Sequence, residues 1–255
     1  MKRRRQSWKE ERRVNNKKRV VTSILLAAFF GALFVLDFFT GIPAVPIAIS
    51  IIAIMCFVEI ITLCQRQLGV RALWAVALQL VIVIAACVFV WIIEIFFEDW
   101  LIIALSLAVP VVAQNISAYF IGRYLLPKIS KDHSPIHQFL NWHHFKLSPK
   151  KTMGVTITTS LIALVVAVPF AIFGPLYFSV TVISSFGAAI GDYLESRLKR
   201  LTYVKDSGEK LRQGTSIFAM LERALASHGG LLDRFDSLLF CAAVSLIPII
   251  IFLIY

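Results

Sequence analysis

The chain of 255 residues has little charge and little sulfur: 16% of its residues are Asp, Glu, Lys or Arg, and four are cysteines. No Cys-x-x-Cys pair occurs, which argues against a disulfide framework or a zinc site. We expect the cysteines to pack as small apolar side chains, since all of them lie in or beside apolar stretches (Cys56, Cys64, Cys87 and Cys241). With 58% hydrophobic residues, the chain also lacks the polar surface that a soluble domain needs.

Polar residues are scarcest in seven long apolar runs. A bilayer core takes about 20 apolar residues per helix, and the runs are close to that length. They show no alternation of polar and apolar residues, so a transmembrane β-barrel is a poor match. The sequence thus predicts an all-α, polytopic membrane protein with about seven transmembrane helices, at residues 20–39, 43–63, 72–93, 100–122, 154–173, 176–193 and 238–255.

Lysine and arginine are absent from the predicted outer connections. All 26 of them lie in four segments on the other side, at residues 1–19, 64–71, 123–153 and 194–237. Because cytoplasmic loops are enriched in Lys and Arg, this pattern predicts a cytosolic N-terminus and an external C-terminus. The predicted organisation is a basic cytosolic arm, four transmembrane helices, a cytosolic loop, and three further helices that include a second cytosolic loop (1–19, 20–122, 123–153 and 154–255, with the second loop at 194–237).

The net charge of +11 would suit a nucleic-acid-binding protein, but no recognition motif accompanies it. Basic residues beside a bilayer set the topology and attract anionic lipid, at about 1 kcal/mol per residue. We therefore expect a bilayer partner and no nucleic acid. The predicted cytosolic loop 123–153 has four histidines without cysteines or paired carboxylates (His133, His137, His143 and His144). A solvated loop explains them better than a metal site.

Polar residues inside the apolar runs need partners. Gln114 and Asn115 lie within the fourth run, and we expect both to face the protein interior, either in hydrogen bonds between helices or at a substrate. Glu59, near the inner end of the second run, is interpreted as structural. In the second cytosolic loop, residues 217–226 have apolar side chains at helical spacing, which predicts a short helix lying on the membrane surface.

Chemistry-bearing residues gather at both ends of this loop. If the sixth helix continues beyond the membrane, one helical face carries two carboxylates, a hydroxyl and an amine, with a guanidinium beside it (Asp192, Glu195, Ser196, Lys199 and Arg200). Such a face can hold a metal and a phosphate together. Before the last helix, His228, Gly229 and Gly230 precede Asp233 and Asp236, and glycines before a helix N-terminus favour phosphate binding. Taken singly, each residue is more often structural, as a helix cap or as a topology signal.

Three segments of this region, 191–200, 204–208 and 228–237, together resemble the C-terminal signature of phosphatidate cytidylyltransferases, also called CDP-diacylglycerol synthases. Residues 118–123 and 147–152 resemble two further segments of that family. The resemblance implies transfer of CMP from CTP to phosphatidic acid with release of pyrophosphate, assisted by Mg²⁺. It also implies CTP and phosphatidic acid as partners, a possible homodimer, and a bacterial-type inner membrane with the active site facing the cytosol.

The same resemblance implies roles for individual residues. It places the metal at Asp192 and Asp233. It makes six residues catalytic (Asp192, Ser196, Lys199, Asp206, Asp233 and Asp236). It gives the substrate-binding role to seven (Lys199, Arg200, Lys205, His228, Gly229, Gly230 and Arg234). The alternatives are a non-catalytic relative, a cytidylyltransferase for another lipid phosphate, and a transporter, for which the repeat symmetry expected of that class is missing.

Overall fold

The computed structural model describes residues 28–64, 69–125, 135–140, 152–204, 207, 220 and 230–255. Among these residues there are helices and no strands, so the predicted all-α class is confirmed for the described part of the chain. The labelled elements are α2 (Ala44–Cys64), α3 (Val70–Phe96), α4 (Trp100–Phe120), the π-helical turn η1 (Ile121–Leu125), α6 (Pro135–Leu140), α7 (Met153–Ala171), α8 (Pro175–Leu201) and α11 (Leu232–Ile254).

Five described helices are long and apolar enough to cross a membrane, and they match five of the seven predicted runs. The chain is therefore an integral membrane protein. The first predicted run is described only from Ala28, as the shorter apolar helix Ala28–Thr40. The sixth run forms most of α8, which is not among the five. A count of seven, and the orientation of the chain, remain predictions.

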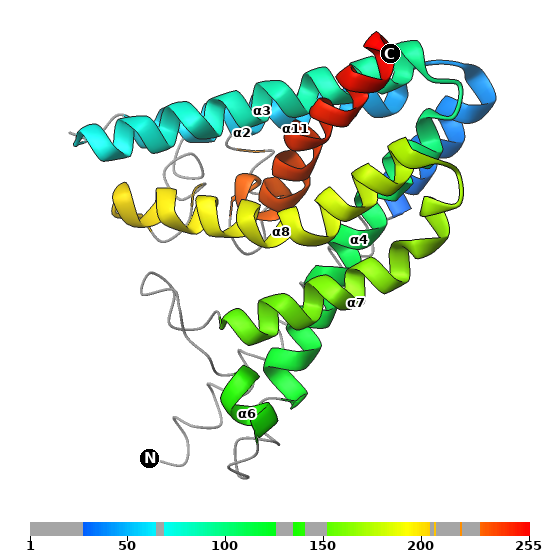
Figure 1. The fold of residues 1–255 in the computed structure, drawn as a ribbon. Coiled ribbons are helices and arrows are strands. Elements are labelled where there is room, and N and C mark those ends of the chain that lie inside the picture. The colour runs from blue at the N-terminus through cyan, green and yellow to red at the C-terminus, as the bar shows by residue number, and fades with distance from the viewer. Residues whose placement is uncertain are drawn as a thin grey trace, which may run out of the picture.

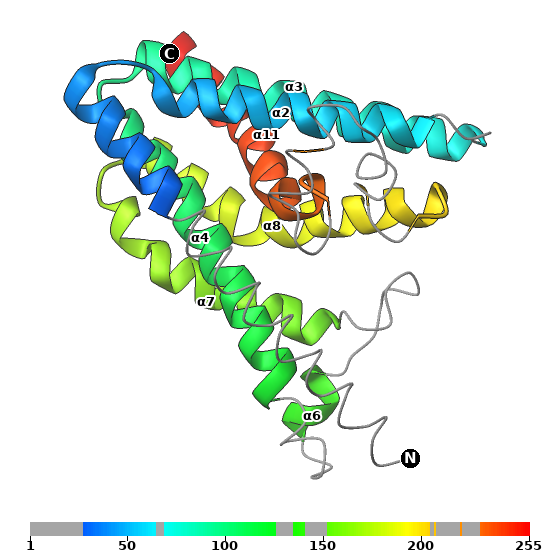
Figure 2. The same ribbon diagram turned by 180° about the vertical axis from the view of Figure 1, so that it is seen from behind.

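The helices form two pairs that α8 and α11 connect (Figures 1 and 2). In both views α2 and α3 run side by side, and α4 lies beside α7 at a steep angle to that first pair. The last helix, α11, packs against α3 and α8, and α8 also packs against α4 and α7. The core gathers where these elements meet and includes Phe89, Ile103, Val180 and Ile249.

Helices α8 and α11 approach each other closely because α8 carries glycine where they touch. A Cβ atom on Gly191 would lie 2.8 Å from the carbonyl oxygen of Asp236 and 2.8 Å from Cβ of Phe240. One turn earlier, a Cβ atom on Gly187 would lie 3.2 Å from Sγ of Cys241, a cysteine that is fully buried, as predicted. Small residues let membrane helices approach closely. This contact brings Asp192, the residue after Gly191, to the start of α11.

The structure tests the prediction for the amides of α4. Gln114 is buried and its Nε2 donates to Oγ of Ser160 on α7 at 2.7 Å, as expected for a hydrogen bond between helices. Asn115 is exposed, so the expectation that it faces the protein interior is wrong. Adjacent residues of a helix lie about 100° apart, because each turn has 3.6 residues, so one of the two amides turns outward.

Two other sequence predictions fall largely outside the described residues. Of the predicted surface helix at 217–226, the structure describes only Met220, which is exposed. The side chains of the loop histidines are not among those described. The described part of that loop is α6, whose Phe139 carbonyl lies against the Gly154 position at the start of α7.

Candidate active site

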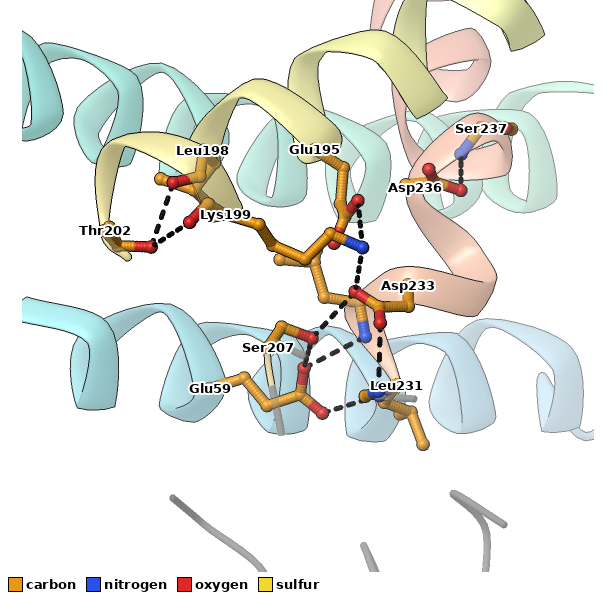
Figure 3. Close-up of polar contacts among 12 residues, drawn as sticks. Glu59, Glu195, Leu198, Lys199, Thr202, Ser207, Leu231, Asp233, Asp236 and Ser237 are labelled. Atoms are coloured by element: carbon orange, nitrogen blue, oxygen red, sulfur yellow. Dashed lines mark hydrogen bonds and ion pairs between the residues drawn. The ribbon is translucent and has the colours of Figure 1, made fainter. Parts of the chain in front are cut away.

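Three helices bring polar side chains together at one end of the α8–α11 contact (Figure 3). The last turns of α8 provide Glu195 and Lys199, the first turns of α11 provide Asp233 and Asp236, and α2 provides Glu59. The sequence favours this arrangement locally, because residues three and four apart on α8 share a face. The glycine contact described above turns that face toward α11.

Three carboxylates form a group that is able to hold a metal ion. One oxygen from each of Asp192, Glu195 and Asp236 lies within 4.8 Å of the others. Two members are almost fully buried, with 1% of Glu195 and 6% of Asp236 exposed. Grouped carboxylate oxygens suit a hard cation such as Mg²⁺, which prefers oxygen ligands.

Lys199 connects this group to Asp233. Its Nζ lies 2.8 Å from Oε2 of Glu195 and 3.2 Å from Oδ1 of Asp233. The carboxyl groups of Glu195 and Asp233 are also within hydrogen-bonding reach of each other. Asp233 Oδ2 accepts from the backbone N–H of Gly230 at 3.3 Å. Glu195 therefore belongs to both halves of the site, the three-carboxylate group and the lysine ion pairs.

The buried position of Glu195 favours its neutral form and leaves one oxygen open to a cation. Oε1 of Glu195 is buried and has no hydrogen-bond partner. Burial raises the pKa of Glu195 to about 10, Asp233 adds to the rise, and Lys199 acts against it. Glu195 lies past the apolar run 176–193, in the last turns of α8. A cation beside the free oxygen would favour the ionised form and lower the pKa.

The start of α11 is held by carboxylates. Glu59 is fully buried, and its Oε1 accepts from the N–H of Leu231 at 2.6 Å. Its Oε2 accepts from the N–H of Leu232 at 3.1 Å and from Oγ of Ser207 at 2.8 Å. The glycine pattern had suggested that the N–H groups at this helix start face a phosphate. In the described structure the N–H groups of Gly230, Leu231 and Leu232 donate to Glu59 or Asp233, and the phosphate-binding role of Gly230 stays a prediction.

The structure brings most of the described candidate residues to this site. Asp192, Lys199, Asp233 and Asp236 meet there, and Gly230 contacts Asp233 through its backbone. Ser196 and Arg234 are partly buried on the same helices, and Arg200 is exposed at the end of α8. Four further candidates lie outside the described residues (Lys205, Asp206, His228 and Gly229). That Asp192 and Asp233 jointly hold a metal remains a prediction, because the grouping seen here joins Asp192 to Glu195 and Asp236.

Sequence reasoning gave no site role to Glu59 or Ser207. Ser207 lies within one of the segments that resemble the family, but no chemistry marked it. As a carboxylate in an apolar run, Glu59 has a structural interpretation from the sequence. The available signal was its rarity: a carboxylate within a transmembrane helix is costly and marks a functional site by default.

These features define a class: an integral membrane protein of helices, with a carboxylate and lysine site where α8 meets α11. Comparison with known proteins specifies the class further. The Cytidylyltransferase family matches residues 69–252, which include every element from α3 to most of α11. This chain belongs to the Cytidylyltransferase family.

Among curated proteins, the phosphatidate cytidylyltransferase of Thermotoga maritima is 37% identical over 117 residues, which is 40% of this chain and 37% of that protein. The phosphatidate cytidylyltransferase of Bacillus subtilis is 37% identical over 101 residues, 37% of this chain and 32% of that protein. Phosphatidate cytidylyltransferase 4, chloroplastic, of Arabidopsis thaliana is 33% identical over 107 residues, 39% of this chain and 23% of that protein. The match thus spans about a third of the length of the first two relatives. No solved structure matches the chain.

Proposed function

We propose that this protein transfers CMP from CTP to phosphatidic acid, forming CDP-diacylglycerol and pyrophosphate. The observation that carries the proposal is the convergence of Asp192, Glu195 and Asp236 beside Lys199, on segments that resemble phosphatidate cytidylyltransferases. In this reaction a phosphate oxygen of the lipid attacks the α-phosphorus of CTP, and the bond to the β-phosphate breaks. The protein supplies no nucleophile. Its task is to position two anionic substrates and to neutralise their charge.

Magnesium fits the residues of the site. The three carboxylates offer oxygen ligands within 4.8 Å of one another, and Oε1 of Glu195 is buried without a hydrogen-bond donor. Asp192 with Asp233 remains our proposed metal pair, and Asp236 and Glu195 are the carboxylates that would complete it. When bound, Mg²⁺ supplies positive charge to phosphate oxygens and stabilises the leaving pyrophosphate.

The chain's basic residues have separate tasks in this proposal. Lys199 is held by Glu195 and Asp233 at 2.8 and 3.2 Å, so its amine stands next to the place where phosphates would enter. Arg200 and Arg234 flank it on α8 and α11, and both would bind phosphate oxygens. Lys205, His228 and Gly229 keep the substrate-binding role that the resemblance implies. Ser196 and Asp206 keep their catalytic role on the same basis.

The orientation belongs to the same proposal. The asymmetry of lysine and arginine supports seven transmembrane helices, a cytosolic N-terminus and an active site facing the cytosol, where CTP is found. A reporter fused after Tyr255 should be external, and a reporter in the loop 123–153 should be cytosolic. Both reporters on one side of the membrane would contradict seven helices.

The deciding experiment uses the purified full-length protein with CTP, Mg²⁺ and phosphatidic acid, and measures released pyrophosphate and CDP-lipid together. We expect both products in equal amounts and neither without Mg²⁺. Parallel reactions with other lipid phosphates test the alternative acceptor. A well-folded protein that is inactive with every lipid would overturn the proposal and favour the non-catalytic relative.

A further inference from the structure

Glu59 connects the first part of the chain to the candidate active site. It lies on α2, is 0% exposed, and accepts hydrogen bonds from Leu231, Leu232 and Ser207. These partners are separated from it by 148 to 173 residues of sequence. The family match begins at residue 69, so it does not include Glu59.

The backbone contacts place the first turn of α11. The first N–H groups of a helix have no partner within the helix, and a carboxylate there is favoured by both hydrogen bonding and the helix dipole. Glu59 uses both of its oxygens for this purpose, at 2.6 and 3.1 Å. Asp233 is the next residue after Leu232, so the position of its side chain depends on where this turn is held.

Ser207 lies between the two carboxylates (Figure 3). Its Oγ is 2.8 Å from Oε2 of Glu59 and 3.1 Å from Oδ1 of Asp233. A hydroxyl group carries one proton, so Ser207 donates to one carboxylate at a time. The closer acceptor is Glu59. While Glu59 accepts this proton, Oδ1 of Asp233 is left to Lys199, which lies 3.2 Å away.

We propose that Glu59 is a positioning residue for the metal and phosphate site, acting on Asp233 through Ser207 and through the first turn of α11. This inference rests on the proposed function. It makes α2 a part of the active unit rather than a neighbouring membrane anchor. It further implies that an amide cannot replace the Glu59 carboxylate. In the Glu59→Gln variant, an NH₂ group at the Oε1 position would face the Leu231 N–H. At the Oε2 position it would face the Leu232 N–H and donate to Ser207, which would turn the hydroxyl proton toward Asp233 and reduce the negative charge offered to a cation.

The test compares Glu59→Gln and Ser207→Ala with a matched control, Asp37→Asn. Asp37 is also a buried carboxylate, 3% exposed, and its Oδ2 accepts from the N–H of Val45 near the start of α2 at 3.0 Å. It caps a helix at the other end of α2, away from Asp233. Each full-length variant is purified in detergent, and two quantities are measured: turnover of CTP, and the Mg²⁺ concentration at the midpoint of thermal stabilisation.

We expect Glu59→Gln to raise the Mg²⁺ midpoint or lower kcat by about 10- to 100-fold, the usual effect of losing a group that orients a metal ligand. Ser207→Ala should shift the same midpoint by less, and Ser207→Thr, which retains a hydroxyl, should restore it. The double variant Glu59→Gln, Ser207→Ala should have an Mg²⁺ midpoint close to that of Glu59→Gln alone. The two effects should not add, because both residues act on Asp233 through the same hydrogen bonds. Asp37→Asn should leave the Mg²⁺ midpoint unchanged, because Asp37 has no contact with Asp233 or Ser207 among the hydrogen bonds described.

Several results would overturn the inference. One is an Mg²⁺ midpoint in Glu59→Gln that matches wild type, with any loss of activity explained by a lower melting temperature. If Glu59→Gln does not fold, an unchanged midpoint in Ser207→Ala decides against the inference, and so does a wild-type protein that Mg²⁺ does not stabilise. A wild-type protein that Mg²⁺ stabilises but that releases no pyrophosphate contradicts the proposed function instead, and the midpoints still test Glu59.

Discussion

The two ends of α2 each have a buried carboxylate that caps a helix, and they differ in their neighbours. At one end Asp37 accepts from Val45, and it interacts with Glu94, another carboxyl within hydrogen-bonding reach. Among the described residues, no ion pair forms at this end. At the other end Glu59 accepts a hydrogen bond from Ser207, Ser207 also contacts Asp233, and Asp233 lies beside the amine of Lys199. A capping carboxylate is thus structural in itself, and it becomes part of a site only where a cation and further carboxylates converge.

The largest expected effect is the loss of turnover on changing carboxylates of the site near Glu59, compared with carboxylates near Asp37. Asp192→Asn and Asp233→Asn should each fold, insert normally and lose CTP-dependent turnover by about 100-fold or more, because the carboxylate charge is what binds a cation. Asn caps a helix about as well as Asp, so a purely structural Asp233 would tolerate the change. Pyrophosphate release at ordinary Mg²⁺ measures the effect. Near-normal turnover in either variant would remove that residue from the site.

A smaller effect is expected from the glycine that brings α8 to α11. In Gly191→Ala the added Cβ would meet the Asp236 carbonyl oxygen at 2.8 Å and Cα of Ser237 at 2.9 Å, both of them backbone atoms. Such overpacking costs about 1–3 kcal/mol, and it moves Asp192 away from Asp236. We expect a lower melting temperature together with a weaker response to Mg²⁺.

The matched control for this substitution is Gly31→Ala in the helix Ala28–Thr40, where an added Cβ has no atom within 4 Å. Alanine is favoured over glycine in helices by about 0.5–1 kcal/mol, so this variant should be neutral or slightly more stable. Equal melting temperatures for the two alanine variants would show that the α8–α11 contact is looser than described here.

The smallest effect is expected at the Asp37 end. Oε2 of Glu94 is buried and has no hydrogen-bond partner among the described residues, and Glu94 interacts with Asp37, a carboxyl of the same charge. In Glu94→Gln the amide can donate to Asp37, a hydrogen bond with a net value of about 1 kcal/mol. The melting temperature should therefore stay the same or rise, with turnover unchanged. A Glu94→Gln variant that folds but loses turnover would contradict the claim that the Asp37 end of α2 is structural only.

Much of the fold was predictable because the signals are local. A long apolar run predicts a membrane helix whatever surrounds it, and five of the seven runs appear as candidate spans. The shared face of Asp192, Glu195 and Lys199 follows from helical periodicity alone. The sixth run is predicted from the sequence but is not among the five candidate spans, because its Ser, Thr and Gly residues lower its hydropathy. Two of those glycines lie where α8 touches α11.

The partners of the carboxylates were not predictable in the same way. Asp233 and Asp236 are one turn apart, yet Asp236 joins the group of Asp192 while Asp233 contacts Lys199 and Ser207. That division depends on the rotation of α11 against α8, which is set by packing at Gly191. Glu59 depends on contacts more than 140 residues away, and no periodicity in the sequence encodes them.

The hydrogen bonds of Glu59 also set an order of events in biosynthesis. Its backbone donor Leu231 follows it by 172 residues. At about 5–20 residues per second, translation leaves α2 without this partner for roughly 10–30 seconds. Insertion scales give about 2.5–3.5 kcal/mol for Asp at the centre of a bilayer helix, and a carboxyl group near a helix end, such as Glu59 in α2, costs less. The N–H groups at the start of α11 therefore satisfy a carboxylate that a much earlier helix carries.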